Sequence, residues 1–167
     1  TLISACHDAR VPLKIAGTGP QAAQLQTLAN SLGADVEFLG YVSGSRLHDT
    51  IRSARVAAVP SESYENAPLG VLEAYALGKP VIGARIGGIP ELIREGETGC
   101  IVPSGDRQAL ATTIRAFADM PDDAVQEIGI QGRQWVERDF TSKQYLERIR
   151  VLYDSVSRLS SEAATAI

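Results

Sequence analysis

Five short apolar or β-branched runs recur along this chain and limit what it can fold into. They occupy residues 13–17, 36–40, 56–60, 80–84 and 99–103. Runs of this length without regular polar alternation are typical of strands buried on both faces, as in a parallel sheet. The runs therefore predict five strands of a parallel sheet.

Helical patterns lie between these runs. Apolar residues follow the i, i+3, i+4, i+7 spacing in 25–32 and more weakly in 47–54, and they crowd one broad side of 69–77. Strands that alternate with helices predict an α/β fold: a Rossmann-like, doubly wound open sheet with helices on both faces. Such sheets bind ligands at the carboxyl ends of their strands. With 167 residues, we expect a single domain over 1–167.

The pattern becomes purely helical after Asp106. This residue is placed to cap a helix that runs through Ala118, and 121–140 predicts a further helix. Thr141 and Gln144 form a capping box that opens one more. The small, polar tail 160–167 is expected to fray. Because residues 1–6 already have a mid-helix pattern, we expect the chain to be a fragment of something longer.

Composition excludes several classes of function. The formal net charge is −4 with acids and bases interspersed, so no basic stripe is present to bind nucleic acid. We see no secretory signal and no apolar run near the roughly 20 residues of a membrane span. We expect a cytoplasmic protein, with peripheral contact at the inner membrane face left open.

Cys6 and Cys100 are isolated in apolar settings and are interpreted as small buried fillers.

The segment 62–91 contains a helix start with an unusual glycine. Pro68 is suited to the first turn of a helix that runs to about Leu77, with Gly78 as its left-handed stop. The N–H groups of 69–71 would then be unpaired donors at the positive end of the helix dipole, where a phosphate fits. Gly70 costs about 1 kcal/mol relative to Ala inside a helix. Close approach of a ligand and close packing of helix against strand explain this glycine equally well.

Two carboxylates flank this helix start. Glu65 comes three residues before Pro68, and Glu73 comes five after it, about 7.5 Å along the axis. A carboxylate accepts two hydrogen bonds in one plane, which suits the vicinal hydroxyls of a sugar or a ribose. The alternative for Glu73 is a solvent-facing side chain.

The run PSESYENAPLGVLEAYALGKPVIGARIGGIPELI, followed by EGETGCIVPSGD, resembles the signature of retaining GT-B glycosyltransferases of the family 4 type, the glycosyl transferases group 1. Its core is a Glu-x7-Glu motif, matched by Glu65 and Glu73. The motif stands in register with Ala-x-x-x-Gly-x-Pro-Val, Gly-Gly-x-x-Glu and Gly-x-x-Gly-x-x-Val-Pro. The similarity runs from LKIAGTGP to the C-terminal helices. It implies the C-terminal half of a GT-B fold, which binds a nucleotide-diphosphate sugar of the UDP or GDP type.

The resemblance also implies roles for particular positions. Glu65 is matched to the catalytic residue that contacts the transferred sugar, and Glu73 to the residue that holds the ribose hydroxyls. Backbone amides around 68–70 would meet the diphosphate, while Tyr41 and Val42 would line the nucleobase pocket. The donor-binding set expected on this basis is Gly17, Gly19, Tyr41, Val42, Glu65, Asn66, Ala67, Pro68, Leu69, Gly70 and Glu73.

The same resemblance implies partners and a missing part. No Asp-x-Asp motif occurs, so we expect no metal and no cofactor besides the nucleotide-sugar substrate. The implied partners are the sugar donor, an N-terminal domain of the same protein, and an acceptor glycan, lipid or small molecule. A strand and a Gly-Arg…Lys segment that usually precede this region are absent, so the isolated fragment is expected to be inactive. Asn66 and Ala67 stand where Gly and an aromatic residue are frequent, which leaves the identity of the sugar open.

Other functions share this architecture. Gly17, Gly19 and Ala22 match the G-x-G-x-x-A dinucleotide fingerprint. An NAD-dependent dehydrogenase also needs an acid at the end of the next strand, whereas Asp35 and Glu37 come at or before its start. A sugar-nucleotide epimerase, a phosphorylase and a non-catalytic nucleotide-binding module remain as alternatives.

Overall fold

The computed structural model describes the backbone of residues 1–165 and the side chains of residues 1–156. It groups the chain into two compact units, Thr1–Arg133 and the part from Gln134 onward. The first unit contains all the strands described, and the second is helical. The expected single domain over 1–167 stays a prediction.

All five predicted strands are confirmed, each inside the run that predicted it. They are β1 (Leu13–Ala16), β2 (Val36–Gly40), β3 (Ala57–Val59), β4 (Val81–Ala84) and β5 (Gly99–Val102). Every strand pair is parallel, as the absence of polar alternation indicated. The four residues of the central strand β4 are all buried.

The strands pair in two groups instead of one continuous sheet. One group has the order β1-β2 and the other the order β3-β4-β5. Leu13 lies opposite Val36 in the first, and Val81 lies opposite Gly99 in the second. Over the part of the chain that the structure describes, no ladder joins β1 to β3, so each of these strands keeps one open edge.

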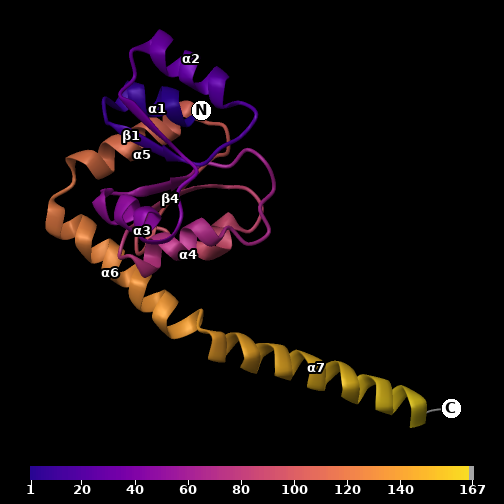
Figure 1. Ribbon diagram of the computed structural model, residues 1–167. Helices are drawn as coiled ribbons and strands as arrows, with labels where there is room; N and C mark the ends of the chain where they lie inside the picture. Colours follow the sequence, from indigo (N-terminus) through magenta and orange to yellow (C-terminus); the bar gives the residue numbers. More distant parts are fainter. Residues whose placement is uncertain (166–167) are drawn as a thin grey trace. The chain divides into compact units, whose positions relative to one another are not determined.

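Helices cover both faces of the strands, as predicted. The strand-connecting and flanking helices are α1 (Leu2–Ala9), α2 (Ala22–Leu32), α3 (Gly44–Ser53), α4 (Leu69–Ala76) and α5 (Arg107–Asp119). Figure 1 shows α1, α2 and α5 on one side of the strands and α3 and α4 on the other. A short 3₁₀ turn, η1 (Ile89–Leu92), follows β4 and was not predicted.

The main core forms where α1 and α5 pack on the sheet. It contains buried residues of α1, α5, β4 and β5 together with Val125, namely Ala5, Cys6, Ala9, Ile82, Val102, Leu110, Ile114, Phe117 and Val125. At the rim, Arg107 donates two hydrogen bonds of 2.6 Å to Asp8 and so ties α5 to α1. Cys6 is only 4% exposed, which confirms its role as a small filler; Cys100 is half-buried.

Glycines bring helix α6 (Asp122–Asp139) close to the end of α4. A Cβ atom built on Gly129 would lie 2.1 Å from the carbonyl oxygen of Gly78, and one on Gly132 would lie 2.4 Å from the Tyr75 ring. Both distances are too short for real atoms. The absence of side chains at these two positions therefore allows α6 to pack on α4.

The C-terminal unit holds the last residues of α6 and helix α7 (Ser142–Thr165). Trp135 and Phe140 pack edge to face, with ring centroids 5.4 Å apart. The hydroxyl of Thr141 accepts a hydrogen bond of 3.2 Å from the Gln144 N–H, which confirms one half of the predicted capping box. Fraying of the tail 160–167 stays a prediction, and its last two residues lie outside the described residues.

Candidate functional site

The loops that follow β3, β4 and β5 meet at the carboxyl edge of the sheet. The Gly88 N–H, after β4, donates a hydrogen bond of 2.7 Å to the carbonyl oxygen of Glu65, after β3. The Ser104 hydroxyl, after β5, donates one of 2.9 Å to the carbonyl oxygen of Ser61. Carboxyl ends of parallel strands share one edge of a sheet, which is where open α/β folds bind ligands. The loop that carries Glu65 is therefore held from two neighbouring loops.

The Glu65 side chain is fixed within its own loop. Glu65 is half-buried, and its Oε1 accepts a hydrogen bond of 2.9 Å from the Ser61 hydroxyl. A hydrogen bond to an ionised carboxylate is stronger than one between neutral groups. This hydrogen bond gives the carboxylate a defined orientation within the loop.

The Gly87-Gly88 pair lies directly against the Glu65 loop. Gly87 has φ +55°, and a Cβ atom there would lie 2.4 Å from the Glu65 carbonyl oxygen. A Cβ atom on Gly88 would lie 2.4 Å from the carbonyl oxygen of Asn66. Any side chain at either position would push the loop away. From the sequence, Gly-Gly served only as part of a resemblance, and its spacing from Glu65 gave no sign of this contact.

Helix α4 begins and ends within one residue of the prediction. Pro68 is its N-cap, and Gly78 follows it with φ +70°, its N–H donating to the Tyr75 carbonyl at 2.8 Å. One of the predicted free donors is wrong: the Val71 N–H donates to the Pro68 carbonyl at 3.0 Å, because an i→i−3 bond closes the first turn. The N–H groups of Leu69 and Gly70 remain as candidates for a phosphate.

Gly70 faces open space. The residue is exposed, and a Cβ atom built on it would meet nothing within 4 Å. Of the two explanations for this glycine, close packing against a strand of this chain is thereby excluded. The approach of a ligand to the backbone stays a prediction.

The remaining predicted residues of this loop and helix are accessible. Glu73 is exposed on α4, so its carboxylate needs no buried partner, and Asn66 and Ala67 are also exposed. Leu69, at the first position of the helix, is 66% exposed despite its apolar side chain. The start of α4 is thus open to a ligand from Glu65 to Glu73.

The turns after β1 and β2 contain the other predicted residues. The Gly17 N–H donates to the Gly40 carbonyl at 2.8 Å, which joins the two turns, and both Gly17 and Gly19 are exposed. Tyr41 is 77% exposed, whereas the Val42 side chain is 8% exposed. Tyr41 could therefore stack on a ligand, and Val42 could offer only its backbone. These residues follow the first sheet, and the Glu65 loop follows the second.

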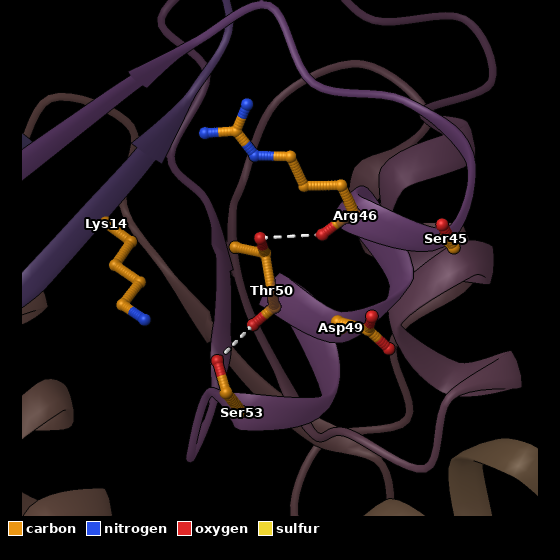
Figure 2. A pocket seen from close by; sticks show the side chains of 6 residues that line it. All are labelled: Lys14, Ser45, Arg46, Asp49, Thr50 and Ser53. Atoms are coloured by element: carbon orange, nitrogen blue, oxygen red, sulfur yellow. Dashed lines mark hydrogen bonds between the residues drawn. The ribbon is translucent and has the colours of Figure 1, made fainter.

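An open pocket of about 380 Å³ lies elsewhere, between β1 and α3. Figure 2 shows the residues that line it: Lys14, Ser45, Arg46, Asp49, Thr50 and Ser53. None of the predicted donor-binding residues lines this pocket. The hydroxyls of Thr50 and Ser53 donate at 2.8 Å to carbonyls of α3, and Lys14 lies 3.8 Å from Glu37. Several of its polar groups thus serve the protein itself, and we place the candidate site at the Glu65 loop.

The structure also bears on the dinucleotide alternative. Glu37 is the second residue of β2 and pairs with Lys14 in the middle of β1. β2 ends in Gly40, so the acid that would hold a ribose at the end of this strand is not there.

Among residues with described side chains, no three His, Cys, Asp or Glu residues gather as metal ligands. None of the described helices is long and apolar enough to cross a bilayer.

The fold and its loops define a Rossmann-like α/β domain with a ligand-accessible edge. Residues 1–119 match the model of the family described as glycosyl transferases group 1, and the chain belongs to this family. It is 31% identical over 137 residues to the putative colanic acid biosynthesis glycosyltransferase WcaL of Escherichia coli K12, covering 78% of this chain and 34% of that protein. It is 45% identical over 100 residues to the D-inositol 3-phosphate glycosyltransferase of Streptomyces coelicolor, covering 59% and 22%.

Solved structures agree with this assignment. Sucrose-phosphate synthase from Thermosynechococcus elongatus superposes with a TM-score of 0.78 at 28% identity, covering 95% of this chain and 43% of that chain. Anabaena HepE in complex with UDP-glucose superposes with a TM-score of 0.80 at 24% identity, covering 92% and 44%, and shows the fold alone. The chain thus spans less than half the length of these relatives. Its architecture fits the C-terminal half of a GT-B glycosyltransferase.

Proposed function

We propose that this chain is the donor-binding half of a retaining glycosyltransferase, which transfers a sugar from a nucleotide-diphosphate sugar to an acceptor. One observation carries the proposal. Half-buried Glu65 accepts a hydrogen bond from Ser61 in the loop before α4, and Leu69 and Gly70, the first two residues of α4, are exposed. A carboxylate beside an open helix start offers one site for sugar hydroxyls and one for phosphate.

The proposed chemistry depends mainly on stabilising the leaving group. As the bond from sugar to diphosphate breaks, negative charge gathers on the diphosphate. The N–H groups of Leu69 and Gly70 and the positive end of the α4 dipole would stabilise this charge without having to reorganise. Glu65 would contact the sugar, while Glu73 would hold the ribose hydroxyls. Tyr41 and the backbone of Val42 would contact the base.

A donor of the UDP type has some support from a relative of the same fold. HepE has been crystallised with UDP, with UDP and glucose, and with UDP-glucose. We propose a UDP or GDP sugar as the donor, without a metal ion. The acceptor, whether a glycan, a lipid or a small molecule, would be held by another domain of the protein.

The open edges of β1 and β3 support a second part of the proposal. Both strands are apolar or mostly so, and each presents backbone groups on the edge away from its partner. Such edges are normally paired or covered. We therefore propose that a strand from outside residues 1–167 pairs with β1 and β3 and joins the two sheets. The isolated chain, which lacks it, is then expected to be inactive.

The proposal is tested on the full-length protein with UDP and GDP sugars as donors. Glu65→Gln keeps the size of the side chain and removes its charge, and we expect the rate of transfer to fall by roughly a hundredfold or more. Glu62→Gln is the matched control, since Glu62 is an exposed acid of the same loop. Normal transfer by Glu65→Gln would refute the role of Glu65. Saturable NAD binding without any response to nucleotide sugars would refute the glycosyltransferase proposal as a whole.

A further inference from the structure

Two hydrogen bonds, one to the backbone of Ser61 and one from its side chain, connect the loop after β5 to the carboxylate of Glu65. Ser104 donates to the carbonyl oxygen of Ser61 at 2.9 Å, and the Ser61 hydroxyl donates to Oε1 of Glu65 at 2.9 Å. Both serines are half-buried. The first contact fixes the backbone of Ser61, and the second uses that fixed backbone to orient the carboxylate.

The backbone of Glu65 is held independently of its side chain. The Gly88 N–H donates to its carbonyl oxygen at 2.7 Å, and Gly87 and Gly88 lie too close to the loop to carry a Cβ atom. The loop thus cannot shift toward β4. The side-chain torsions of Glu65 can still change, and the hydrogen bond from the Ser61 hydroxyl restricts them.

We infer that Ser61 and Ser104 are positioning residues that orient the Glu65 carboxylate for sugar transfer, an inference that rests on the proposed function. Ser61 engages Oε1 and leaves Oε2 available for a sugar hydroxyl or the anomeric centre. A carboxylate that is already oriented loses less conformational entropy when the donor binds. It also lies at a defined distance from the sugar. Ser104 acts one step further away, through the backbone of Ser61. Neither serine needs to touch the substrate.

The test compares Ser61→Ala, Ser61→Thr and Ser104→Ala in the full-length protein, with separate measurement of kcat and KM for the nucleotide-sugar donor. Loss of a hydrogen bond to a charged group predicts a fall in kcat of roughly tenfold to a hundredfold for Ser61→Ala, with KM changed by less than about twofold. Ser61→Thr keeps the hydroxyl and should recover most of kcat. Ser104→Ala should lower kcat by a smaller factor.

Two further comparisons separate positioning from general damage to the loop. Ser63→Ala is the matched control, because Ser63 is exposed in the same loop, and its kcat should be unchanged. If Ser104 acts through Ser61, the double variant Ser61→Ala with Ser104→Ala should be no slower than Ser61→Ala alone. The melting temperature of each variant shows whether it folds. If Ser61→Ala does not fold, the kcat values of Ser61→Thr and Ser104→Ala decide the question.

The outcomes distinguish this inference from the proposed function. If Glu65→Gln abolishes transfer while Ser61→Ala behaves like Ser63→Ala, the positioning role is refuted and the proposed function stands. A Ser61→Thr variant that folds normally but is as slow as Ser61→Ala also refutes it. If Glu65→Gln transfers sugar normally, the proposed role of Glu65 fails, and the positioning role fails with it.

Discussion

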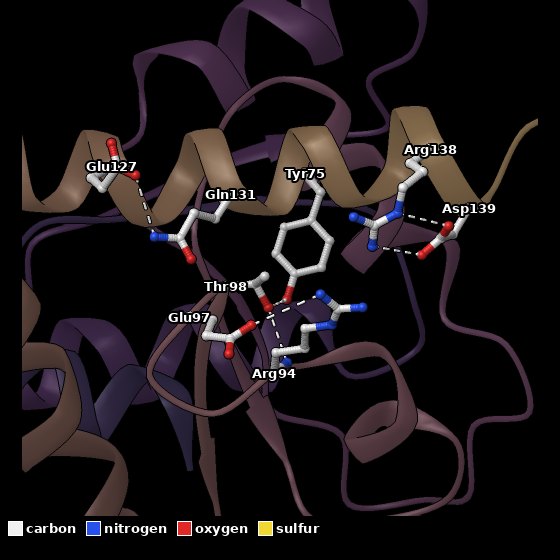
Figure 3. Close-up of polar contacts among 8 residues, drawn as sticks. All are labelled: Tyr75, Arg94, Glu97, Thr98, Glu127, Gln131, Arg138 and Asp139. Carbon is white, nitrogen blue, oxygen red and sulfur yellow. Dashed lines mark hydrogen bonds and ion pairs between the residues drawn. The ribbon is translucent and has the colours of Figure 1, made fainter.

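The hydroxyl groups of Tyr75 and Thr98 lie 2.8 Å apart in the core, where the two residues are 0% and 1% exposed. Thr98 Oγ1 also accepts a hydrogen bond of 3.0 Å from the Arg94 N–H, and Figure 3 shows the three residues together. Tyr75 belongs to α4, and Thr98 directly precedes β5. This contact ties the helix that carries the candidate phosphate site to the sheet.

Tyr75→Phe is expected to lower the free energy of unfolding by roughly 1–2 kcal/mol. The substitution removes one buried hydrogen bond and leaves Thr98 with one partner fewer. Urea unfolding should show a lower midpoint with an unchanged m-value. Tyr145→Phe is the control, since Tyr145 is 65% exposed and should change stability by less than about 0.5 kcal/mol. Equal midpoints for the two variants would contradict the role of the Tyr75 hydroxyl.

Burial of the Cys6 thiol predicts a loss of stability in alkali. Desolvation raises its pKa from 9.0 to about 11. As the pH rises through 9, the unfolded chain releases this proton while the folded chain retains it, so the free energy of unfolding falls until about pH 11. The rise is about two pKa units. At about 1.4 kcal/mol for each unit, the loss amounts to at most roughly 3 kcal/mol.

Urea unfolding at pH 8, 9 and 10 measures this effect, with Cys6→Ala as the comparison. The variant lacks the thiol and should lose less stability over this range than the parent. Tyr75, whose pKa burial raises to about 12, contributes mainly above pH 10 and stays the same in both proteins. Parallel curves for parent and variant would show that the thiol does not titrate as its burial implies.

Gly70→Ala is expected to separate stability from donor binding. A Cβ atom at this position meets nothing in the chain, so the better helix propensity of Ala should stabilise the protein by up to about 1 kcal/mol. If phosphate approaches this backbone, the same methyl group should weaken binding of the nucleotide sugar by tenfold or more. Urea unfolding and donor titration of the full-length protein measure the two effects.

Gly129→Ala provides the contrast for Gly70. Its Cβ atom would lie 2.1 Å from the Gly78 carbonyl, so this substitution should destabilise the fold by roughly 1–3 kcal/mol. If the Gly70→Ala variant binds the nucleotide sugar as tightly as the parent does, the proposed binding of phosphate at the start of α4 is contradicted. A Gly129→Ala variant of parental stability would contradict the close packing of α6 on α4.

Local signals in the sequence predicted most of the elements. The apolar runs predicted the strands, and in β4 all four residues are buried, as expected for a parallel strand that is covered on both faces. The expected burial on both faces is wrong for β1, where half-buried residues alternate with exposed ones, because one of its edges has no partner strand among the described residues. Asp106 caps α5 by accepting a hydrogen bond of 2.9 Å from the Ala109 N–H, a contact that spans only three residues. Pro68 and Gly78 bound α4 for equally local reasons, namely a fixed φ and a positive φ.

The contacts that build the candidate site were not predictable in this way. Ser104 and Ser61 are 43 residues apart, and no periodicity or spacing relates them. The same holds for Gly88 and Glu65, and the prediction that the Val71 N–H is unpaired failed because the first turn of α4 closed on Pro68. The division of the strands into two groups also depends on which edges meet.

By itself, the sequence determined the class of fold, the order of strands and helices, the ends of α4 and the family, because these follow from local burial, capping and motif spacing. Only the tertiary structure decided that three loops meet around Glu65, that Ser61 orients its carboxylate, and that Gly70 is open while Gly129 is not. These properties depend on distances between residues far apart in the chain, and such distances exist only once the parallel strands have brought their carboxyl ends to one edge.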